Sequence, residues 1–124
     1  MHTRKKGLLT ESLACDYLVA QGLILIERNF HSRFGEIDLI LRQDTCWVFV
    51  EVRHRSAKHA SRYGGGVNSI NTRKKQRLIR TVYFYIQSRK LQNSLTRIDM
   101  VDVTGNLESP EFQWITNAVS ADGW

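Results

Sequence analysis

Two apolar runs of strand length stand close together in the first half of the chain. They cover residues 35–42 and 46–55, are rich in Ile, Val, Phe and Trp, and are separated by the polar stretch 43–45. Runs of this kind joined by a few polar residues predict a β-hairpin. Each run also contains an acid, Asp38 in the first and Glu51 in the second, at a position where an apolar residue would be expected.

The length of the connecting turn decides how these two acids face each other. If an even number of residues connects the strands, either Asp44-Thr45 or residues 43–46, ladder partners sum to 89 and Asp38 lies directly across from Glu51. The same register sets Glu36 across from Arg53. A loop of three residues would instead turn the two acids to opposite faces.

Side chains alternate between the two faces of a strand. On the first strand, one face is expected to carry Ile37, Leu39 and Leu41, and the other Glu36, Asp38 and Ile40. On the second strand, Val48, Val50 and Val52 are expected to oppose Trp47, Phe49, Glu51 and Arg53. Both acids should therefore lie on one face, together with Ile40 and Phe49.

Two carboxylates opposite each other on neighbouring strands have Cβ atoms about 4.5–5.5 Å apart and destabilise the sheet unless something neutralises them. A divalent cation would do so, because Mg²⁺ prefers oxygen ligands from one or two carboxylates, completed by water, a backbone carbonyl and phosphate. Alternatively, each acid pairs with a neighbouring base such as Arg53 or Arg55, or lies exposed at an edge.

The remaining pattern predicts a chain order of α-β-β-β-α-β-β. After a helix over residues 7–21 that ends at Gly22, we expect a strand over residues 23–30 covered on both faces, a connection over 31–35, and the hairpin. A basic, glycine-rich loop over 53–66 without periodicity is expected to be mobile. A helix over 72–90, a strand over 95–103, a short edge strand over 112–115 and a frayed tail over 116–124 complete the chain.

The predicted helices contain charges that call for an explanation. Glu11 lies on or beside the packed face of the first helix, so it needs a partner there unless it is a surface acid favoured by the helix dipole. The second helix is expected to pack through Leu78, Ile79, Val82, Tyr83, Tyr85 and Ile86. It begins with four cations in five residues, which opposes its dipole. Phosphate docking at this helix start would explain them; a solvated basic face is the alternative.

Composition narrows the class of partner. The 124 residues fit one domain, over 1–124, with 42% hydrophobic and 24% charged residues, as in ordinary globular proteins. Lys and Arg number 18 against 12 Asp and Glu, a net charge of +6 that favours nucleic acid as partner, although many basic proteins bind nothing anionic. Two cysteines without zinc spacing indicate neither a disulfide framework nor a structural zinc.

Nothing in the pattern indicates a membrane partner. The basic N-terminus is followed by amphipathic rather than continuously apolar sequence, and no apolar run approaches the ~20 residues of a membrane span. We therefore expect a cytoplasmic protein. The oligomeric state stays open, and the sequence is compatible with a homodimer.

The motif formed by the two acids resembles a known one. An acid on one strand followed by a strand ending in Glu-x-basic, here Asp38, Glu51, Val52 and Arg53, is similar to the PD-(D/E)XK motif of the restriction-endonuclease-like superfamily. More closely, Gly7-x-x-x-Glu11-x-x-Ala14, Asn29-Phe30, Gly-Glu-Ile-Asp-Leu-Ile at 35–40, Val-Phe-Val-Glu-Val-Arg-x-Arg at 48–55 and Arg-Ile-Asp-Met-Val at 97–101 resemble the YraN family of small bacterial proteins. This resemblance covers the chain from about Gly7 to Val103.

The resemblance implies an α/β restriction-endonuclease-like core, a central mixed sheet flanked by helices. It implies metal-dependent cleavage of phosphodiesters in structured or branched DNA, by a fold similar to archaeal Holliday-junction resolvases; DNA is favoured over RNA, and the choice between them stays open. Glu11, Asp38, Glu51 and the Val52 carbonyl would then hold Mg²⁺ or Mn²⁺, and Arg53 would stabilise the transition state. The resemblance favours Glu11 reaching the other two acids, and it leaves Asp99 and Asp102 as structural or supporting acids.

One departure and two rival functions follow. The superfamily usually has Lys where this chain has Arg53, and a guanidinium cannot serve as a general base. The same fold could therefore be a binding module for nucleic acid with a vestigial metal site, or a protein-protein adaptor whose basic loop meets an acidic partner. The residues expected to contact nucleic acid are Arg33, Arg55, Lys58, Arg62, Arg73, Lys74, Lys75 and Arg77.

Overall fold

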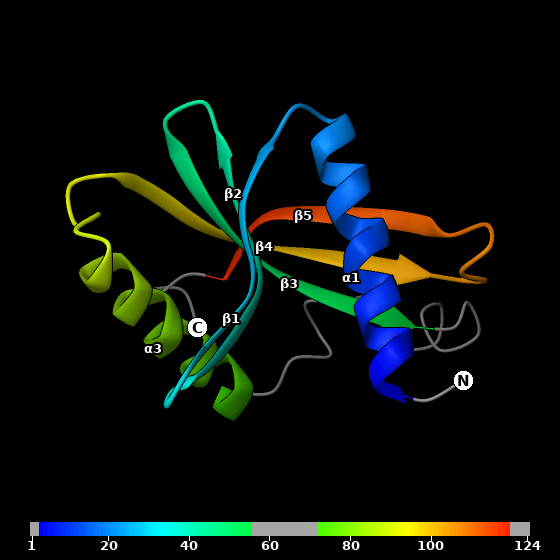
Figure 1. Ribbon diagram of the computed structural model, residues 1–124, viewed down its shortest axis with the longest axis horizontal. Coiled ribbons are helices and arrows are strands. Elements are labelled where there is room, and N and C mark those ends of the chain that lie inside the picture. Colours follow the sequence, from blue (N-terminus) through cyan, green and yellow to red (C-terminus); the bar gives the residue numbers. More distant parts are fainter. Residues whose placement is uncertain (1–2, 56–71, 120–124) are drawn as a thin grey trace.

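A computed structural model describes residues 3–55 and 72–119 (Figure 1). The elements follow the predicted order: α1 (Thr3–Ala20), β1 (Ile24–Ser32), β2 (Gly35–Gln43), β3 (Cys46–Arg55), α3 (Thr72–Ser88), β4 (Leu95–Thr104) and β5 (Glu111–Val119). The strands form one mixed sheet in the order β1-β2-β3-β4-β5, in which only β3 and β4 pair in parallel. The predicted fold class is thus confirmed, and the architecture is consistent with a restriction-endonuclease-like α/β core.

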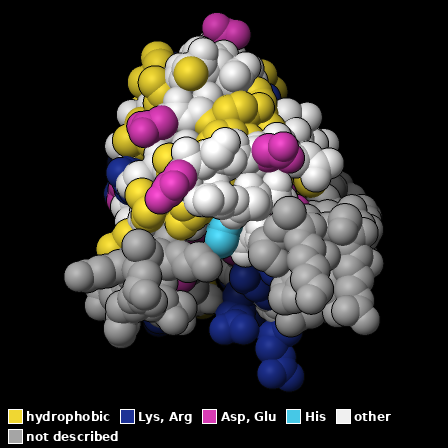
Figure 2. All heavy atoms as spheres, turned by 90° about the vertical axis from the view of Figure 1, so that its right-hand side faces the viewer, with side chains coloured by type: hydrophobic (Ala, Val, Ile, Leu, Met, Phe, Trp, Pro, Cys, Tyr) yellow, Lys and Arg dark blue, Asp and Glu magenta, His cyan; other side chains and the backbone are white. Residues whose placement is uncertain are grey.

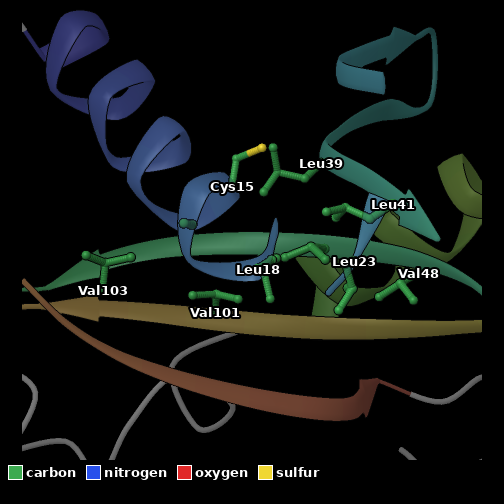
Figure 3. Packing of buried hydrophobic residues seen from close by; sticks show 10 residues of the cluster. Cys15, Leu18, Leu23, Leu39, Leu41, Val48, Val101 and Val103 are labelled. Atoms are coloured by element: carbon green, nitrogen blue, oxygen red, sulfur yellow. The ribbon is translucent and has the colours of Figure 1, made fainter. Parts of the chain in front are cut away.

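Helices α1 and α3 pack on opposite faces of the sheet. Figure 3 shows the core beneath α1, where Cys15 and Leu18 pack on Leu39 and Val101. The core beneath α3 contains Ile37, Ile40, Phe49, Leu78, Val82, Tyr85, Ile98 and Val119. Because parallel neighbours require a crossover, the segment that contains α3 carries the chain from the end of β3 back to the start of β4.

Helix α1 is longer than the sequence pattern indicated. It begins at Thr3 rather than near Gly7, since the Arg and Lys residues that precede Gly7 are good helix formers. Its end is as predicted. Gly22 has φ of 103°, its N–H donates to Val19 O at 3.0 Å, and the N–H of Leu23 donates to Leu18 O at 3.2 Å. This pair of hydrogen bonds is a Schellman cap, which favours glycine at the left-handed position.

The predicted hairpin register is confirmed over most of its length. Asp44-Thr45 form a two-residue turn, and β2–β3 partners sum to 89 from Gln43–Cys46 to Leu39–Val50. The ladder ends there, one pair before Asp38 and Glu51. Consequently these two acids do not form a ladder pair as predicted, and neither do Glu36 and Arg53. The strands β2 and β3 stop pairing next to the acids.

The predicted alternation of faces on β2 fails at Asp38. Ile37 packs beneath α3 with Ile40, whereas Leu39 packs beneath α1. On β1, Phe30 pairs with Ile37 and Arg28 pairs with Leu39, and Asn29 between them has φ of 53°. At Asp38, between Ile37 and Leu39, the β2–β3 ladder has ended and the side chain takes the Val52 N–H; the prediction that Ile37 shares a face with Leu39 was wrong.

Three other expectations are corrected. Strand β1 is an edge strand and is not covered on both faces, because Ile24 is 64% exposed. Strand β5 continues to Val119 beyond the predicted residues 112–115, and Val119 is buried. Tyr83 of α3 is 53% exposed rather than packed; Thr81, on the other side of Val82, is buried in its place.

Three further observations concern the predicted loop, the cysteines and membrane spans. The loop predicted over residues 53–66 lies, from residue 56 onward, outside the described residues, as do Lys58 and Arg62. Both cysteines are free thiols. In the described parts of the chain, no helix is long and apolar enough to cross a membrane.

Candidate active site

Asp38 lies where β2 and β3 separate. Its side chain is 9% exposed, and Oδ2 accepts a 2.8 Å hydrogen bond from the backbone N–H of Val52. The carboxylate therefore continues the contact between the two strands beyond the last ladder pair, Leu39 and Val50. Val52 was predicted to offer its carbonyl oxygen to a metal ion. In the structure, its N–H contacts an acid of the site.

Burial and neighbouring charge raise the pKa of Asp38 to about 8, from an ordinary value of 3.8. Desolvation is the largest cause, and repulsion from Glu51 is next, followed more weakly by Glu11 and Glu36. The Val52 N–H opposes these effects because it stabilises the charged carboxylate. Without a counter-cation, Asp38 therefore holds a proton at neutral pH.

Glu11 approaches the same acid from α1. It is half-buried, and desolvation raises the pKa of its carboxyl, while a side-chain hydrogen bond with Asp38 lowers it. Its Oε1 is buried and has no hydrogen-bond partner among residues 3–55 and 72–119. Thus the predicted approach of Glu11 to Asp38 is present in the structure. One of its oxygens is a buried acceptor that a cation or a donor would satisfy.

Glu51 faces α3 and binds a cation there. Its Oε1 lies 3.1 Å from Nζ of Lys74, and the side chains of Glu51 and Lys74 are 12% and 47% exposed. Lys74 was predicted as a phosphate contact and not as the partner of an acid. In the sequence, only the basic start of α3, which opposes the helix dipole, indicated that Lys74 needs an anionic partner. It did not indicate which acid that partner is.

A cleft of about 400 Å³ opens between the β1–β2 turn and the first turns of α3. Its walls are His31, Ser32, Gly35, Glu36, Glu51, Lys74, Arg77 and Leu78. Glu36 is paired with His31 through a contact of 3.3 Å between Oε2 and Nδ1. The cleft thus has the Glu51–Lys74 pair on one side and Arg77 beside it, and it is large enough for a phosphate group with its sugar.

The width of this cleft depends on the close approach of Gly35 to α3. Gly35 has φ of 148°, and a Cβ on it would lie 3.0 Å from Oγ1 of Thr81 and 3.8 Å from the carbonyl oxygen of Arg77. A larger residue would push the β1–β2 turn away from α3. The close approach of Gly35 therefore holds one wall of the cleft against the other.

The other cations that were predicted to contact nucleic acid lie on more than one element of the structure. Arg73 and Arg77 are exposed and Lys75 is half-buried at the start of α3, and Arg33 lies exposed in the β1–β2 turn. Figure 2 shows Lys and Arg side chains gathered at the lower edge of one face, with Asp and Glu scattered above them. The cations that the sequence grouped as one contact surface therefore occupy at least two elements that border the cleft.

Arg53 and Arg55 lie half-buried at the end of β3. Arg53 is the parallel-ladder neighbour of Asp102 on β4, which is 1% exposed. Neighbours in a parallel ladder project from the same face, so a base and a buried acid stand side by side. The sequence analysis missed this relationship because the partner of β3 was not predicted.

Asp99 has a structural role, in line with the prediction. It is fully buried and accepts hydrogen bonds from Arg97 Nε at 3.0 Å, Trp114 Nε1 at 3.0 Å and the N–H of Asn117 at 2.7 Å. These donors tie β4 to β5. Asp99 is thus a saturated acceptor and not a ligand.

The three acids have the right chemistry for a hard divalent cation but are not arranged around one. Within the described residues, no group of three or more His, Cys, Asp or Glu side chains forms a ready metal site. Glu51 is turned to Lys74, and one oxygen of Asp38 is taken by Val52. The unsatisfied Oε1 of Glu11 and the raised pKa of Asp38 are nevertheless features that binding of a divalent cation would relieve.

The fold and the site together define a class, an α/β domain with a restriction-endonuclease-like core and an acid cluster next to a basic cleft. The family model described as "Uncharacterised protein family UPF0102" matches residues 10–103. The chain belongs to this family, which is the YraN family, so the resemblance stated from the sequence motifs is confirmed.

Curated relatives are similar over nearly their whole length. A UPF0102 protein of Methylococcus capsulatus is 41% identical over 120 residues, covering 97% of this chain and 94% of the relative. One from Nitrosomonas europaea is 45% identical over 113 residues, 91% of this chain and 92% of the relative. One from Legionella pneumophila is 40% identical over 120 residues, 96% and 98% respectively. Their names state the family and no activity.

Proposed function

We propose that this protein is a metal-dependent nuclease that hydrolyses phosphodiesters in structured or branched DNA. The observation that carries the proposal is the meeting of Glu11, Asp38 and Glu51, from three different elements, where the pKa of Asp38 is raised to about 8. Neighbouring acids whose ionisation is disfavoured by burial and by mutual repulsion are typical of sites that bind a cation or perform acid-base chemistry. The adjoining cleft with Lys74 and Arg77 supports an anionic substrate.

Glu11, Asp38, Glu51 and the Val52 carbonyl are the groups that would hold Mg²⁺ or Mn²⁺. When bound, such an ion polarises the phosphate and lowers the pKa of the attacking water. For Glu51 to take part, its carboxylate has to leave Lys74, 3.1 Å away. The protein's own contribution before that is to hold Asp38 against Val52 and to keep the acids out of bulk water.

Arg53 and Lys74 have different tasks in this proposal. The Arg53 guanidinium remains charged and would stabilise the negative charge that develops on the phosphorus-bound oxygens. Lys74, already beside Glu51 in the cleft, supplies the ammonium group that the superfamily motif has at the position of Arg53. Lys74 therefore places a lysine next to Glu51, although from α3 and not from the motif position on β3.

The same ion pair favours a second candidate, a binding module without catalysis. If Lys74 neutralises Glu51 permanently, no metal is required and the cleft only holds a phosphate. The same fold would then bind structured nucleic acid through its Lys and Arg side chains, without cleaving it. The adaptor reading, in contrast, requires that affinity for DNA and RNA be absent.

A cleavage assay separates these candidates. Wild-type protein is incubated with duplex, single-stranded and four-way-junction DNA, and with RNA of the same sequences, with Mg²⁺ or Mn²⁺ added. Asp38→Asn should abolish cleavage, whereas Asp44→Asn, a matched control at the other end of the same hairpin, should not; Asp44 has φ of 54°, which asparagine tolerates. Arg53→Ala should lower cleavage, and Arg53→Lys should retain it. Salt-sensitive binding without cleavage under either metal would establish the binding module instead.

A further inference from the structure

One stripe of α3 runs from the cleft to an exposed aromatic side chain. Arg73, Arg77, Arg80 and Phe84 follow one another at spacings of four, three and four residues, so they lie on one face of the helix. All four are exposed, and Phe84 is 40% exposed. Among the described residues, no acid forms an ion pair with Arg77 or Arg80.

The β1–β2 turn adds a second aromatic ring at the end of this stripe. The ring centroids of Phe34 and Phe84 lie 5.6 Å apart, and the Arg33 guanidinium carbon lies 4.9 Å from the Phe34 centroid. Ser32 and Gly35 of the same turn line the cleft. Figure 1 shows this hairpin tip beside α3, and Gly35 of the tip approaches Thr81 and Arg77 of that helix.

Packing alone explains only part of this arrangement. Phe30 contacts Phe84 with centroids 6.3 Å apart and Tyr85 with centroids 5.0 Å apart, which anchors the rings to the core beneath α3. Yet Phe84 keeps two-fifths of its surface exposed to solvent, and Arg80 precedes it by four residues on the same face of α3. Exposed rings among cations match the chemistry of a single nucleic-acid strand, whose phosphates are anionic and whose unpaired bases offer flat faces for stacking.

The dimensions agree with such a strand. Seven residues separate Arg77 from Phe84, about 10 Å along the helix axis. Stacked nucleotides repeat at roughly 3.4 Å along one strand, so about three nucleotides span this distance. A phosphate in the cleft therefore places a base near Phe84.

We propose that Phe84 and Phe34 form a stacking platform for an unpaired base of a DNA strand whose backbone follows Arg80 and Arg77 into the cleft. This inference rests on the proposed function, because it names the part of the substrate that the cleft receives: a strand with unpaired bases next to the cleavage site. A fully paired duplex offers phosphates to the arginines but no free base to the rings.

Fluorescence anisotropy without divalent metal tests the platform independently of cleavage. The ligands are a labelled single-stranded oligonucleotide and the blunt duplex of the same sequence. Phe84→Leu keeps an apolar side chain against Phe30 but removes the aromatic face; it should weaken single-strand binding about tenfold, the effect of one lost stacked base, and leave duplex binding unchanged. Phe84→Trp should bind the single strand at least as tightly as wild type.

The control is Leu95→Ala, an exposed apolar side chain at the start of β4 that is 67% exposed and should affect neither ligand. Thermal unfolding of each variant verifies folding, and the tryptophan variant gives an answer even if the leucine variant is unstable. Equal loss for both ligands, or no loss for either, would overturn the platform. If wild type binds and cleaves DNA while Phe84→Leu behaves like it, the platform alone fails; if wild type binds neither ligand, the proposed function fails as well.

Discussion

The Asp38 carboxylate accepts a hydrogen bond of 2.8 Å from the backbone N–H of Val52, one residue beyond Glu51. This bond crosses from β2 to β3 at the point where their ladder has ended. The Asp38 side chain thus connects β2 to β3 where their backbones no longer pair. This connection keeps Asp38 near Glu51, although repulsion between the two carboxylates raises the pKa of Asp38. The stability of this region should therefore respond to cations, to pH and to the charges on α3.

Metal should stabilise the native protein. A cation bound only by the folded state contributes about 2.7 kcal/mol to the free energy of unfolding when its free concentration is 100 times Kd. Adding Mg²⁺ or Mn²⁺ should therefore raise the Tm of wild type in a thermal melt. Asp38→Asn should be as stable as metal-free wild type, or more so, and should lose the response. If metal does not change the Tm of wild type, and Asp38→Asn has a lower Tm than wild type, the acids have a structural role and bind no metal.

Stability without metal should fall as the pH rises. The pKa of Asp38 is about 8 in the folded state against 3.8 ordinarily, so between these values the folded chain holds a proton that the unfolded chain has lost. The stabilisation is complete below pH 4 and is lost as the pH approaches 8, by up to about 1.4 kcal/mol per unit. Denaturant unfolding between pH 5 and 8 should show this slope in wild type and Asp44→Asn. If Asp38→Asn shows the same slope, another group causes it.

Lys74 and a metal ion should compete for Glu51, whose carboxylate lies 3.1 Å from the lysine. Lys74→Gln should therefore tighten Mn²⁺ binding, measured by calorimetry, while it lowers Tm without metal because Glu51 loses the ammonium group beside it. Cleavage should decrease despite tighter metal binding. Lys90→Asn, two residues beyond the other end of α3, is the control. Weaker Mn²⁺ binding by Lys74→Gln would contradict competition.

Binding of nucleic acid should depend steeply on salt. Each neutralised phosphate contributes about 0.9 to the slope of log K against log salt concentration. Replacing Arg73, Lys74 and Lys75 together by Gln should reduce that slope by about 1–3 in anisotropy titrations of duplex DNA. Lys90→Asn should leave it unchanged. An unaltered slope in the triple variant would exclude the start of α3 from the contact surface.

Gly35→Ala should destabilise the fold and open the cleft. The added Cβ would lie 3.0 Å from Thr81 Oγ1 at a backbone φ of 148° that favours glycine. We expect a loss of about 1–3 kcal/mol in the free energy of unfolding. Gly105→Ala, with φ of 82° and nothing within 4 Å, measures the backbone part alone, about 1 kcal/mol. Equal losses would show that the contact with Thr81 is dispensable.

The sequence by itself determined what depends on neighbouring residues. The two-residue turn at Asp44-Thr45 fixed the hairpin register, Gly22 fixed the end of α1, and the order of elements followed from periodicity. These features were predictable because turns, caps and alternation are local interactions. The motif acids were visible for the same reason, since a charge is conspicuous within an apolar strand.

Tertiary structure decided which groups meet. Ile37 and Leu39, on either side of Asp38, pack on opposite faces of the sheet, and the periodicity of β2 does not contain that information. Packing of α3 brings Lys74 to Glu51, 23 positions earlier in the chain, and presents Phe84 to Phe34. Such contacts depend on how whole elements dock, because side chains far apart in sequence meet only after the apolar faces of helix and sheet have been buried together.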